Sequence, residues 1–483
     1  MPHDYDLVVL GAGPAGLTAG IEALDLGKST LVLEASGQVG GISKTVQIDG
    51  WRFDLGGHRF FTKVQRVEDF WKRILNPEDF LKRPRMSRIF YREKFFDYPL
   101  KPVNALFGLG PIETIRCISS FVWAKIFPPK DQSHFEGWVT ARFGKRLYQI
   151  FFKTYTEKVW GIPTTQLSSA WAAQRIKNLS LTNAILNAFG ISGKSKIVTL
   201  IDSFDYPRLG PGMMWEKCAE IIEAQESAEV HMKEWPTSVI RMNDGIEIQT
   251  NKSSYLATNI ISTVPLSELP LLLKCADPKI LGAAADLKYR DFLTVGLVID
   301  GEETFPDNWI YIHSPEVKVG RIQNFRSWSP DLVQPGFTFL GLEYFVNSGD
   351  EYWESSDQDL IELGIKELSK LQLLDSARIM SGYVVRVPKA YPVYDETYSE
   401  SVTAIAKWLT TEWPEIHAVG RNGMHRYNNQ DHSMLTAMLA VENAFSGEKH
   451  DLWAVNVDDD YHEDGKNAEN QGGRAAPVFK KNG

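Results

Sequence analysis

The chain has 483 residues, which corresponds to roughly three domains at about 150 residues each, and its 43% apolar content is ample for sizeable cores. The formal charge of −9, from 52 basic and 61 acidic residues, argues against nucleic acid as a main partner. The three cysteines, Cys117, Cys218 and Cys275, exclude a disulfide framework and indicate a reducing compartment, so we expect a cytoplasmic protein. Neither a signal peptide nor a run of about 18 apolar residues is found, which predicts no stable membrane insertion.

The first predicted element is a buried strand over residues 7–10, and a helix is expected after Gly16. Between them, Gly11, Gly13 and Gly16 form a G-x-G-x-x-G pattern that encloses Pro14 and Ala15. The three glycines allow a tight turn, a close backbone approach to a pyrophosphate and close packing of helix on strand. The helix N-terminus supplies free N–H groups and a partial positive charge for phosphates.

A second predicted strand, residues 30–33, ends in Glu34, which lies 18 residues after Gly16. A carboxylate at this position accepts hydrogen bonds from an adenosine ribose. Strand, turn, helix and acid together predict a dinucleotide site in a Rossmann-like α/β domain. The alternative is a glycine-rich turn without a ligand.

The segment LEASGQVGGISKT follows, with the doublet Gly40-Gly41 and then Thr45. It resembles the FAD-binding superfamily that contains amine oxidases, protoporphyrinogen oxidase and UDP-galactopyranose mutase. This resemblance, rather than the spacing alone, implies FAD in place of NAD. The next stretch predicts a hairpin that arrives at Gly56-Gly57-His58, a tight turn placed to bring the backbone against the flavin ring. A surface histidine is the alternative for His58.

Residues 67–203 are predicted to be mostly helical, with amphipathic segments over 67–75, 112–127 and 135–157. The aromatic stretch 121–127 lies beside Lys125 and Lys130. It fits either the edge of a core helix, which we favour, or a contact with a membrane surface.

Strands predicted over 238–242, 246–250 and 259–263 return the chain to the first domain. Strand-like runs then continue to about residue 390, interrupted by one amphipathic helix that begins near Ser356. A last strand over 416–419 leads into a helix from about Ser433. We therefore predict a discontinuous FAD-binding domain of the glutathione-reductase type, a helical lobe, a mixed β-sheet lobe and a disordered tail. Their ranges are 1–66 with 204–270 and 413–450, then 67–203, 271–412 and 465–483.

A closer resemblance rests on GGHRFF, YPLKP, WGIPTTQLSSAWAAQRI, the set Trp309, Tyr311 and Arg321, the pair Tyr391-Pro392, and GRNGMHRYNNQDHS. In this order and spacing they resemble UDP-galactopyranose mutase, particularly its eukaryotic-type members. The resemblance extends to about residue 446. It implies an isomerisation of a nucleotide-diphosphate sugar between pyranose and furanose, without net redox, through a reduced-flavin N5–sugar adduct.

The resemblance implies the site residues one by one, and no metal site. The catalytic set is His58, Arg175, Arg321, Tyr391 and Tyr427, in which the two arginines and two tyrosines hold the diphosphate. The substrate wall is Tyr98, Trp160, Trp309 and Tyr311. The residues expected to bind FAD are Gly11, Gly13, Pro14, Ala15, Gly16, Glu34, Ala35, Gly40, Gly41, Ile42, Gly56, Gly57, His58, Val239, Gly420, Arg421, Gln430, Asp431 and Ser433.

The chain also departs from the family pattern where the base would be held. Leu100 and Lys101 replace an aromatic residue and a glutamine, Thr156-Glu157 replaces an asparagine, and the loop between Tyr427 and Gln430 is shorter. We therefore expect diphosphate-sugar chemistry with a base, or a sugar, that differs from those of the family. FAD is expected to be non-covalent, because no cysteine follows Cys275 to form a C-terminal link; NADPH or NADH is a candidate reductant.

Two other classes stay open. One is an FAD oxidoreductase of the amine oxidase or protoporphyrinogen oxidase type, since the same scaffold hosts both chemistries. The other is a non-catalytic binding protein similar to the Rab GDP-dissociation inhibitors. The oligomeric state is not predicted.

Overall fold

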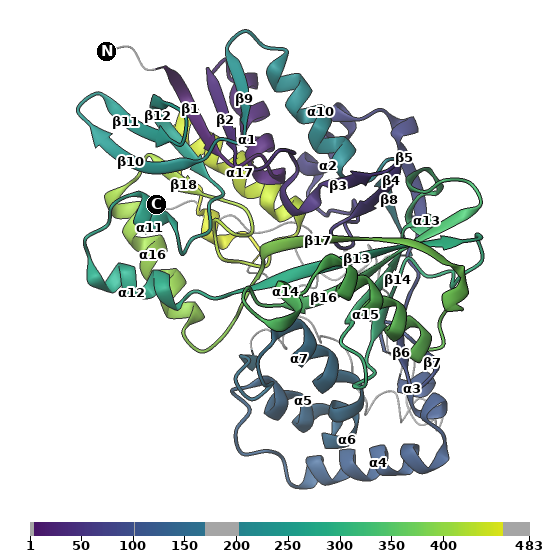
Figure 1. Ribbon diagram of the computed structural model, residues 1–483. Helices are drawn as coiled ribbons and strands as arrows, with labels where there is room; N and C mark the ends of the chain where they lie inside the picture. Colours follow the sequence, from purple (N-terminus) through teal and green to yellow (C-terminus); the bar gives the residue numbers. More distant parts are fainter. Residues whose placement is uncertain (1–3, 101, 170–201, 457–483) are drawn as a thin grey trace.

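The computed structural model describes residues 4–100, 102–169 and 202–456. Figure 1 shows three parts: a sheet with helices on both faces at the top, a second sheet across the middle, and a group of helices at the bottom. This is the α/β architecture that the sequence predicted, with a Rossmann-like domain, a mixed sheet and a helical part. None of the helices in the described ranges is long and apolar enough to cross a membrane.

The first sheet has the strand order β10-β11-β12-β1-β2-β9, and β18 lies beside β12. β12 pairs in parallel with both β1 and β18, and β2 pairs in parallel with β1 and β9, whereas β10 and β11 form an antiparallel extension. The strands are β1 (Tyr5–Leu10), β2 (Thr30–Glu34), β9 (Ala228–Met232), β10 (Pro236–Met242), β11 (Gly245–Thr250), β12 (Ser254–Ser262) and β18 (Ile416–Ala418).

Helices cover both faces of this sheet because its side chains alternate. In β1, Leu7 and Val9 pack into one core, while Val8 and Leu10 pack into the other. Helices α1 (Pro14–Asp25), α2 (Gln65–Ile74), α10 (Gly212–Glu223) and α17 (Gln430–Phe445) contribute to the first core, and α11 (Leu269–Leu272), α12 (Pro278–Asp286) and α16 (Tyr398–Glu412) to the second.

The second sheet has the order β17-β13-β16-β15-β14-β6-β7 and is antiparallel except for the parallel pair β14 and β6. Its strands are β6 (Ser87–Tyr91), β7 (Lys94–Asp97), β13 (Tyr289–Asp300), β14 (Trp309–Ile312), β15 (Arg321–Asn324), β16 (Phe337–Val346) and β17 (Ile379–Pro392). Helix α15 (Asp357–Lys370), with Ser356 as its N-cap, covers one face. The hairpin of β3 (Thr45–Ile48) and β4 (Trp51–Asp54) packs on the other face, which therefore looks toward the first domain.

The helices at the bottom of Figure 1 surround an aromatic core that includes Phe121, Phe135, Phe151 and Trp160. They are α3 (Pro102–Leu109), α4 (Pro111–Ile126), α5 (Phe135–Phe143), α6 (Lys145–Tyr148) and α7 (Thr154–Trp160), with a π-helical turn over Gln149–Lys153.

Two parts of the chain differ from the predicted domain ranges. The stretch predicted as helical over 67–203 contains β5 (Phe80–Pro84), β6 and β7, and β5 pairs with β8 (Ser203–Pro207). Helices α12 and α16, predicted within the sheet lobe, pack on the first sheet. An apolar stripe shows that a helix covers a core but does not identify which sheet it covers. The predicted disordered tail, 465–483, lies outside the described residues.

We expect the stability of the first domain to depend on the protonation of His417 in β18. Burial lowers the pKa of His417 to about 4, and Glu415 opposes the shift. In the unfolded chain the pKa is about 6.5, so the unfolded state binds more protons between pH 6.5 and 4, and the free energy of unfolding falls as the pH falls. In His417→Asn this slope becomes shallower by up to about 1.4 kcal/mol per pH unit. Urea unfolding of both proteins at several pH values measures it; identical slopes would contradict the assignment.

Candidate functional site

The turn after β1 is built on backbone contacts that exclude side chains. Gly11 has φ +104°, and a Cβ there would lie 2.1 Å from Thr263 Oγ1. A Cβ on Gly16 would lie 1.8 Å from the carbonyl oxygen of Gly11. Helix α1 follows with Gly13 as its N-cap, Pro14 at its first position and no side-chain cap. The glycines of this turn carry no side chains, so a phosphate can approach the first N–H groups of α1 closely.

The loop around Gly40-Gly41 closes over this turn. Gly40 donates its N–H to the carbonyl oxygen of Ala12 at 2.8 Å. A Cβ added to Gly13 would meet the Cα of Gly41 at 3.8 Å, so two glycine backbones face each other here. Ile42 continues the loop in a short helical turn over Gly41–Ser43.

Glu34 ends β2 beside the same turn, as predicted. Its carboxylate accepts the N–H of Ala12 at 2.9 Å and the N–H of Ser36 at 2.8 Å, and exposed Ala35 directly follows β2. A carboxylate has about four acceptor positions, so capacity remains for ribose hydroxyls. Val239 lies in the edge strand β10 with its side chain in the core, which leaves only its main chain for a ligand.

The loop after β18 joins the two glycine loops. Gly420 has φ +82°, and a Cβ there would lie 3.2 Å from the Cβ of Ala15. Arg421 donates Nε–H to the carbonyl oxygen of Asn428 at 3.0 Å, which fixes its guanidinium. Three residues at the start of α17 complete this region: Gln430 donates to the carbonyl oxygen of Arg59 at 3.1 Å, Asp431 accepts from Thr62 at 3.0 Å, and Ser433 lies in the first turn.

His58 follows the Gly56-Gly57 turn and points between the two domains. Its Nε2 lies 3.1 Å from the carbonyl oxygen of Leu55, and its Nδ1 lies 3.3 Å from Ser43 Oγ. Because a carbonyl oxygen only accepts, we assign the proton to Nε2. Burial lowers the pKa of His58 to about 4, and the nearby guanidinium groups of Arg421 and Arg321 add to the shift. The imidazole is therefore neutral at neutral pH.

One face of the second sheet presents polar side chains toward His58. Alternation places Ile310 and Ile322 in the core under α15, and Trp309 and Arg321 on the opposite face. Arg321 donates Nε–H to Glu343, its partner on β16. Burial opposes the charge on Arg321, but Glu343 and neighbouring tyrosines raise the pKa of Arg321 well above its usual value. A fixed, half-buried cation therefore lies beside Gly56, where an added Cβ would be 3.7 Å from Arg321 Nη2.

Two tyrosines lie between Arg321 and Arg421. Arg321 Nη2 donates to the hydroxyl of Tyr391 at 3.5 Å, and the rings of Tyr391 and Tyr427 stack with centroids 5.7 Å apart. The Arg421 guanidinium lies 4.5 Å from the Tyr427 ring centroid and 5.6 Å from that of Tyr391. Burial raises the pKa of Tyr391 to about 12, so its hydroxyl remains a donor. Trp160, whose ring is 6.5 Å from that of Tyr427, closes one side.

The remaining predicted wall residues form a second aromatic group with two arginines that the sequence did not single out. Tyr98 packs on Tyr311 at 4.6 Å, and Trp309 contacts Tyr311 edge-on at 6.2 Å. Arg85 lies over both Tyr98 and Trp309, at 5.5 and 5.7 Å, and Arg59 lies 5.2 Å from the Trp309 ring. Arg59 directly follows His58 in GGHRFF, a signal that was available, whereas nothing local distinguishes Arg85.

Not every predicted residue is brought into this arrangement. Arg175 lies outside the described residues, as does Lys101. At the departure Thr156-Glu157, Thr156 is buried and Glu157 accepts from the hydroxyl of Thr164 at 3.3 Å. Of the two arginines that the resemblance implies for the diphosphate, only Arg321 is therefore described. Arg421 also lies close to Tyr391 and Tyr427.

Comparison with known sequences supports the first domain most directly. A family model described as an NAD(P)-binding Rossmann-like domain matches residues 9–74. The chain is 48% identical over 54 residues to a pseudooxynicotine dehydrogenase of Pseudomonas sp, covering 11% of each chain. It is 24% identical over 175 residues to a probable UDP-galactopyranose mutase of Klebsiella pneumoniae, covering 35% of this chain and 44% of that protein. The chain thus spans less than half the length of these two curated relatives.

Comparison with solved structures covers almost the whole chain. The crystal structure of a reduced UDP-galactopyranose mutase superposes with a TM-score of 0.81 at 23% identity, over 92% of this chain and 96% of the other. The class of fold is therefore a Rossmann-like domain joined to a mixed sheet. Within that class, the chain has the UDP-galactopyranose mutase fold, and the predicted fold is confirmed.

We expect Gly16→Ala to impair the dinucleotide site, because its Cβ would lie 1.8 Å from the Gly11 carbonyl oxygen and force the turn open. The purified variant should retain less than a tenth of the bound dinucleotide and unfold at a lower temperature, as measured by absorbance and calorimetry. The matched control is Gly282→Ala in α12, where no atom lies within 4 Å of an added Cβ, so Ala should be neutral or slightly stabilising. Equal dinucleotide content in both variants would contradict the assignment.

Proposed function

We propose that the chain is an FAD-dependent enzyme that acts on a nucleotide-diphosphate sugar and interconverts its pyranose and furanose forms. The observation that carries this proposal is the group formed by Arg321, Tyr391, Tyr427 and Arg421 beside His58. It combines two cations with two hydroxyl donors at the junction between the dinucleotide-binding domain and the second sheet.

The glycine loops fit the FAD part of the proposal. The uncapped N-terminus of α1 suits the pyrophosphate, and Glu34 retains acceptor capacity for the ribose. In its reduced form, bound FAD would supply a nucleophilic nitrogen for the anomeric carbon of the sugar. We also propose NADPH or NADH as the external reductant of the bound FAD.

The arginines and tyrosines match the charge of a diphosphate leaving group. Arg321 keeps its charge through Glu343, and a guanidinium can bind two phosphate oxygens at once. Tyr391 stays protonated well above neutral pH, so it can donate to a phosphate oxygen without adding negative charge. These residues would bind the diphosphate more tightly as negative charge develops on it while its bond to the sugar breaks.

His58 has a different part in the proposal. Because its imidazole is neutral, it adds no charge beside the two arginines. Its Nε2–H is held by the carbonyl oxygen of Leu55, which fixes the ring at the Gly56-Gly57 turn. His58 would therefore orient the ring system of the cofactor and exclude water from it, rather than act as a cation.

The alternative of an amine-oxidising enzyme is less consistent with this group. A substrate ammonium would need the faces of Tyr391 and Tyr427, and the Arg421 guanidinium already lies over both rings. A second cation there would be repelled, whereas an anionic substrate would be attracted.

The test uses purified protein reduced with dithionite under anaerobic conditions and a panel of nucleotide sugars that includes UDP-galactopyranose. We expect furanose product only with reduced flavin, and borohydride should trap the substrate sugar on the cofactor. The best donor in the panel would identify the base, which the departures at Leu100 and Thr156 leave open. Bleaching of the oxidised flavin by an amine or a porphyrinogen, with no response to any nucleotide sugar, would overturn the proposal.

Arg321→Lys should lower kcat by about 10²-fold, since a lysine keeps the charge but loses the planar contact with phosphate and with Tyr391. Tyr427→Phe should lower kcat less, because it removes one neutral donor and leaves both cations. The matched control is Arg208→Lys, a surface arginine paired with Asp331 at 3.0 Å. Flavin content and melting temperature separate a catalytic loss from misfolding; wild-type kcat in Arg321→Lys would exclude the assigned role.

A further inference from the structure

Helix α4 presents an apolar stripe to solvent. Its members recur at helical spacing, in some cases as adjacent pairs, and are 48% to 68% exposed: Ile112, Ile115, Val122, Trp123, Ile126 and, just after the helix, Phe127. We call these six residues the α4 outer face. The opposite side of the same helix, with Cys117, Phe121 and Ala124, is buried in the aromatic core. The helix therefore packs into the aromatic core through its buried side, and the outer face takes no part in that packing.

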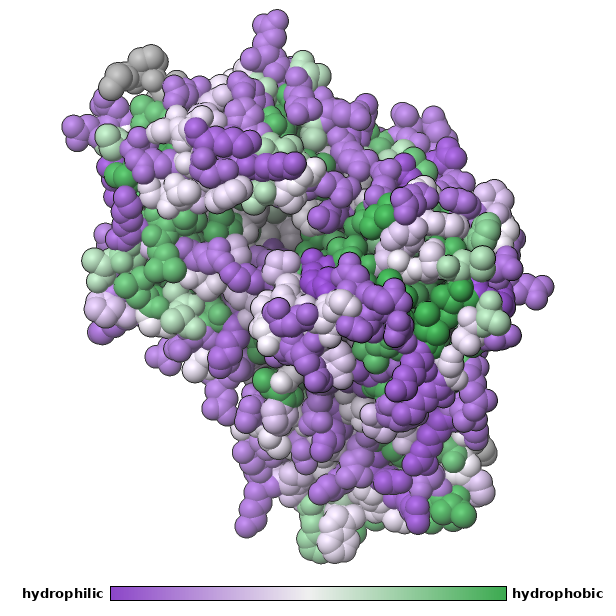
Figure 2. Space-filling model, in the orientation of Figure 1, coloured by the Kyte–Doolittle hydropathy of each residue, from purple (hydrophilic) through white to green (hydrophobic). Residues whose placement is uncertain are grey.

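Exposed apolar residues are concentrated on the α4 outer face rather than scattered over the surface of the protein. Across the described ranges, eleven large apolar residues are exposed, and six of them belong to this one face. Figure 1 shows α4 along the lower edge of the molecule, at the end opposite the first sheet. Apolar side chains appear on that edge in Figure 2. A helix lying along an outer edge can contact a flat surface along its whole length.

The charge around α4 is opposite in sign to that of the chain. Residues 111–153 contain seven Lys and Arg against three Asp and Glu, a net charge of +4 in a chain that carries −9. Arg116, Lys125, Lys130, Arg142 and Lys145 are exposed. Tryptophan and phenylalanine beside lysine and arginine are typical of helices at a lipid headgroup boundary.

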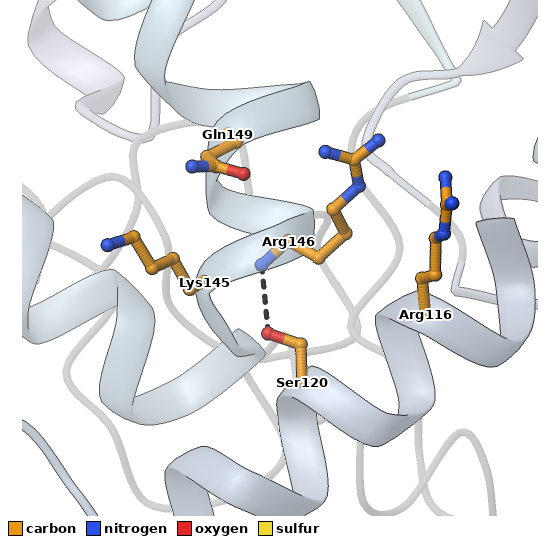
Figure 3. A pocket seen from close by; sticks show the side chains of 5 residues that line it. All are labelled: Arg116, Ser120, Lys145, Arg146 and Gln149. Atoms are coloured by element: carbon orange, nitrogen blue, oxygen red, sulfur yellow. Dashed lines mark hydrogen bonds between the residues drawn. The ribbon is translucent and has the colours of Figure 1, made fainter.

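A surface pocket borders the outer face, and Figure 3 shows its lining. It has a volume of about 300 Å³ and is lined by Arg116, Ser120, Lys145, Arg146 and Gln149. Ser120 accepts the N–H of Arg146 at 3.0 Å, which holds α6 against α4. Glu113 pairs with Arg116 and Arg146, both at 2.6 Å, and Lys145 is a third cation of the lining, so positive charge remains. Such a pocket suits the phosphate of a lipid headgroup.

We propose that the α4 outer face docks on an anionic membrane surface. Its apolar side chains enter the boundary between headgroups and acyl chains, and the surrounding cations bind headgroup phosphates. The charge favours this occupant over a second copy of the chain, because a symmetric contact through α4 would bring two positive surfaces together. The enzyme would then lie on a membrane without spanning it.

The test is flotation of the purified, flavin-loaded chain with vesicles of phosphatidylcholine alone or with phosphatidylglycerol added. We expect binding to the anionic vesicles that weakens as salt rises. The double variant Trp123→Ser, Ile126→Ser should bind at least tenfold more weakly, as should Lys130→Glu, Lys145→Glu. The matched control is Met380→Ser, which removes a 63% exposed apolar residue of β17 and should bind as the wild type does.

Light scattering of the same proteins tests the alternative that a second copy of the chain binds the α4 outer face. A dimer that the Trp123→Ser, Ile126→Ser variant converts to monomer would show that α4 joins two copies, and would overturn the proposal. Absence of binding to anionic vesicles, or equal binding by the α4 variants and the wild type, would overturn it as well. All substituted residues are exposed, so unchanged melting temperatures are expected to accompany these results.

Discussion

The close packing around the glycines of the first turn is the constraint on which the rest of the structure depends. Gly16 leaves no room for a side chain against Gly11, and Gly11 leaves none against Thr263, so β1, α1 and the end of β12 meet at one point. The loops of Gly40 and Gly420 are held against this point by Ala12 and Ala15. The predicted cofactor contacts therefore depend on glycines, which have no functional group of their own.

The second sheet adds charge to this frame through one ion pair. Buried Glu343 and half-buried Arg321 face each other on neighbouring strands, and Tyr391 lies beside Arg321. Removing one partner of a buried pair leaves an uncompensated charge, which is usually costly. Strand register, rather than a flexible loop, thus fixes where the cation lies. The same alternation that buries Ile310 and Ile322 under α15 turns Trp309 and Arg321 toward the cofactor domain.

The sequence predicted best where a signal is local. Gly11, Gly16 and Glu34 lie within one strand–turn–helix–strand unit; the two glycines form the predicted tight turn and close packing, and Glu34 ends β2 as predicted. Arg85 was missed because its contact with the Trp309 ring joins residues far apart in the chain, whereas Arg59 lies in the GGHRFF motif and was not singled out. Strands β5 to β7 were missed because their charged and aromatic residues do not alternate clearly. Helix α4 was expected to be a core edge, and the structure shows both a buried side and an exposed one.

The pairing of β12 links the two ends of the chain. The first half of β12 pairs with β11, while its last residues pair with β18 at positions 416–418. The region that surrounds Gly11 is therefore completed by a strand and a helix made more than 400 residues later. During synthesis, the amino-terminal half leaves the ribosome with this edge of its sheet unpaired, so the cofactor would be captured only when the chain is nearly complete. Cofactor binding would then occur only after translation has reached α17.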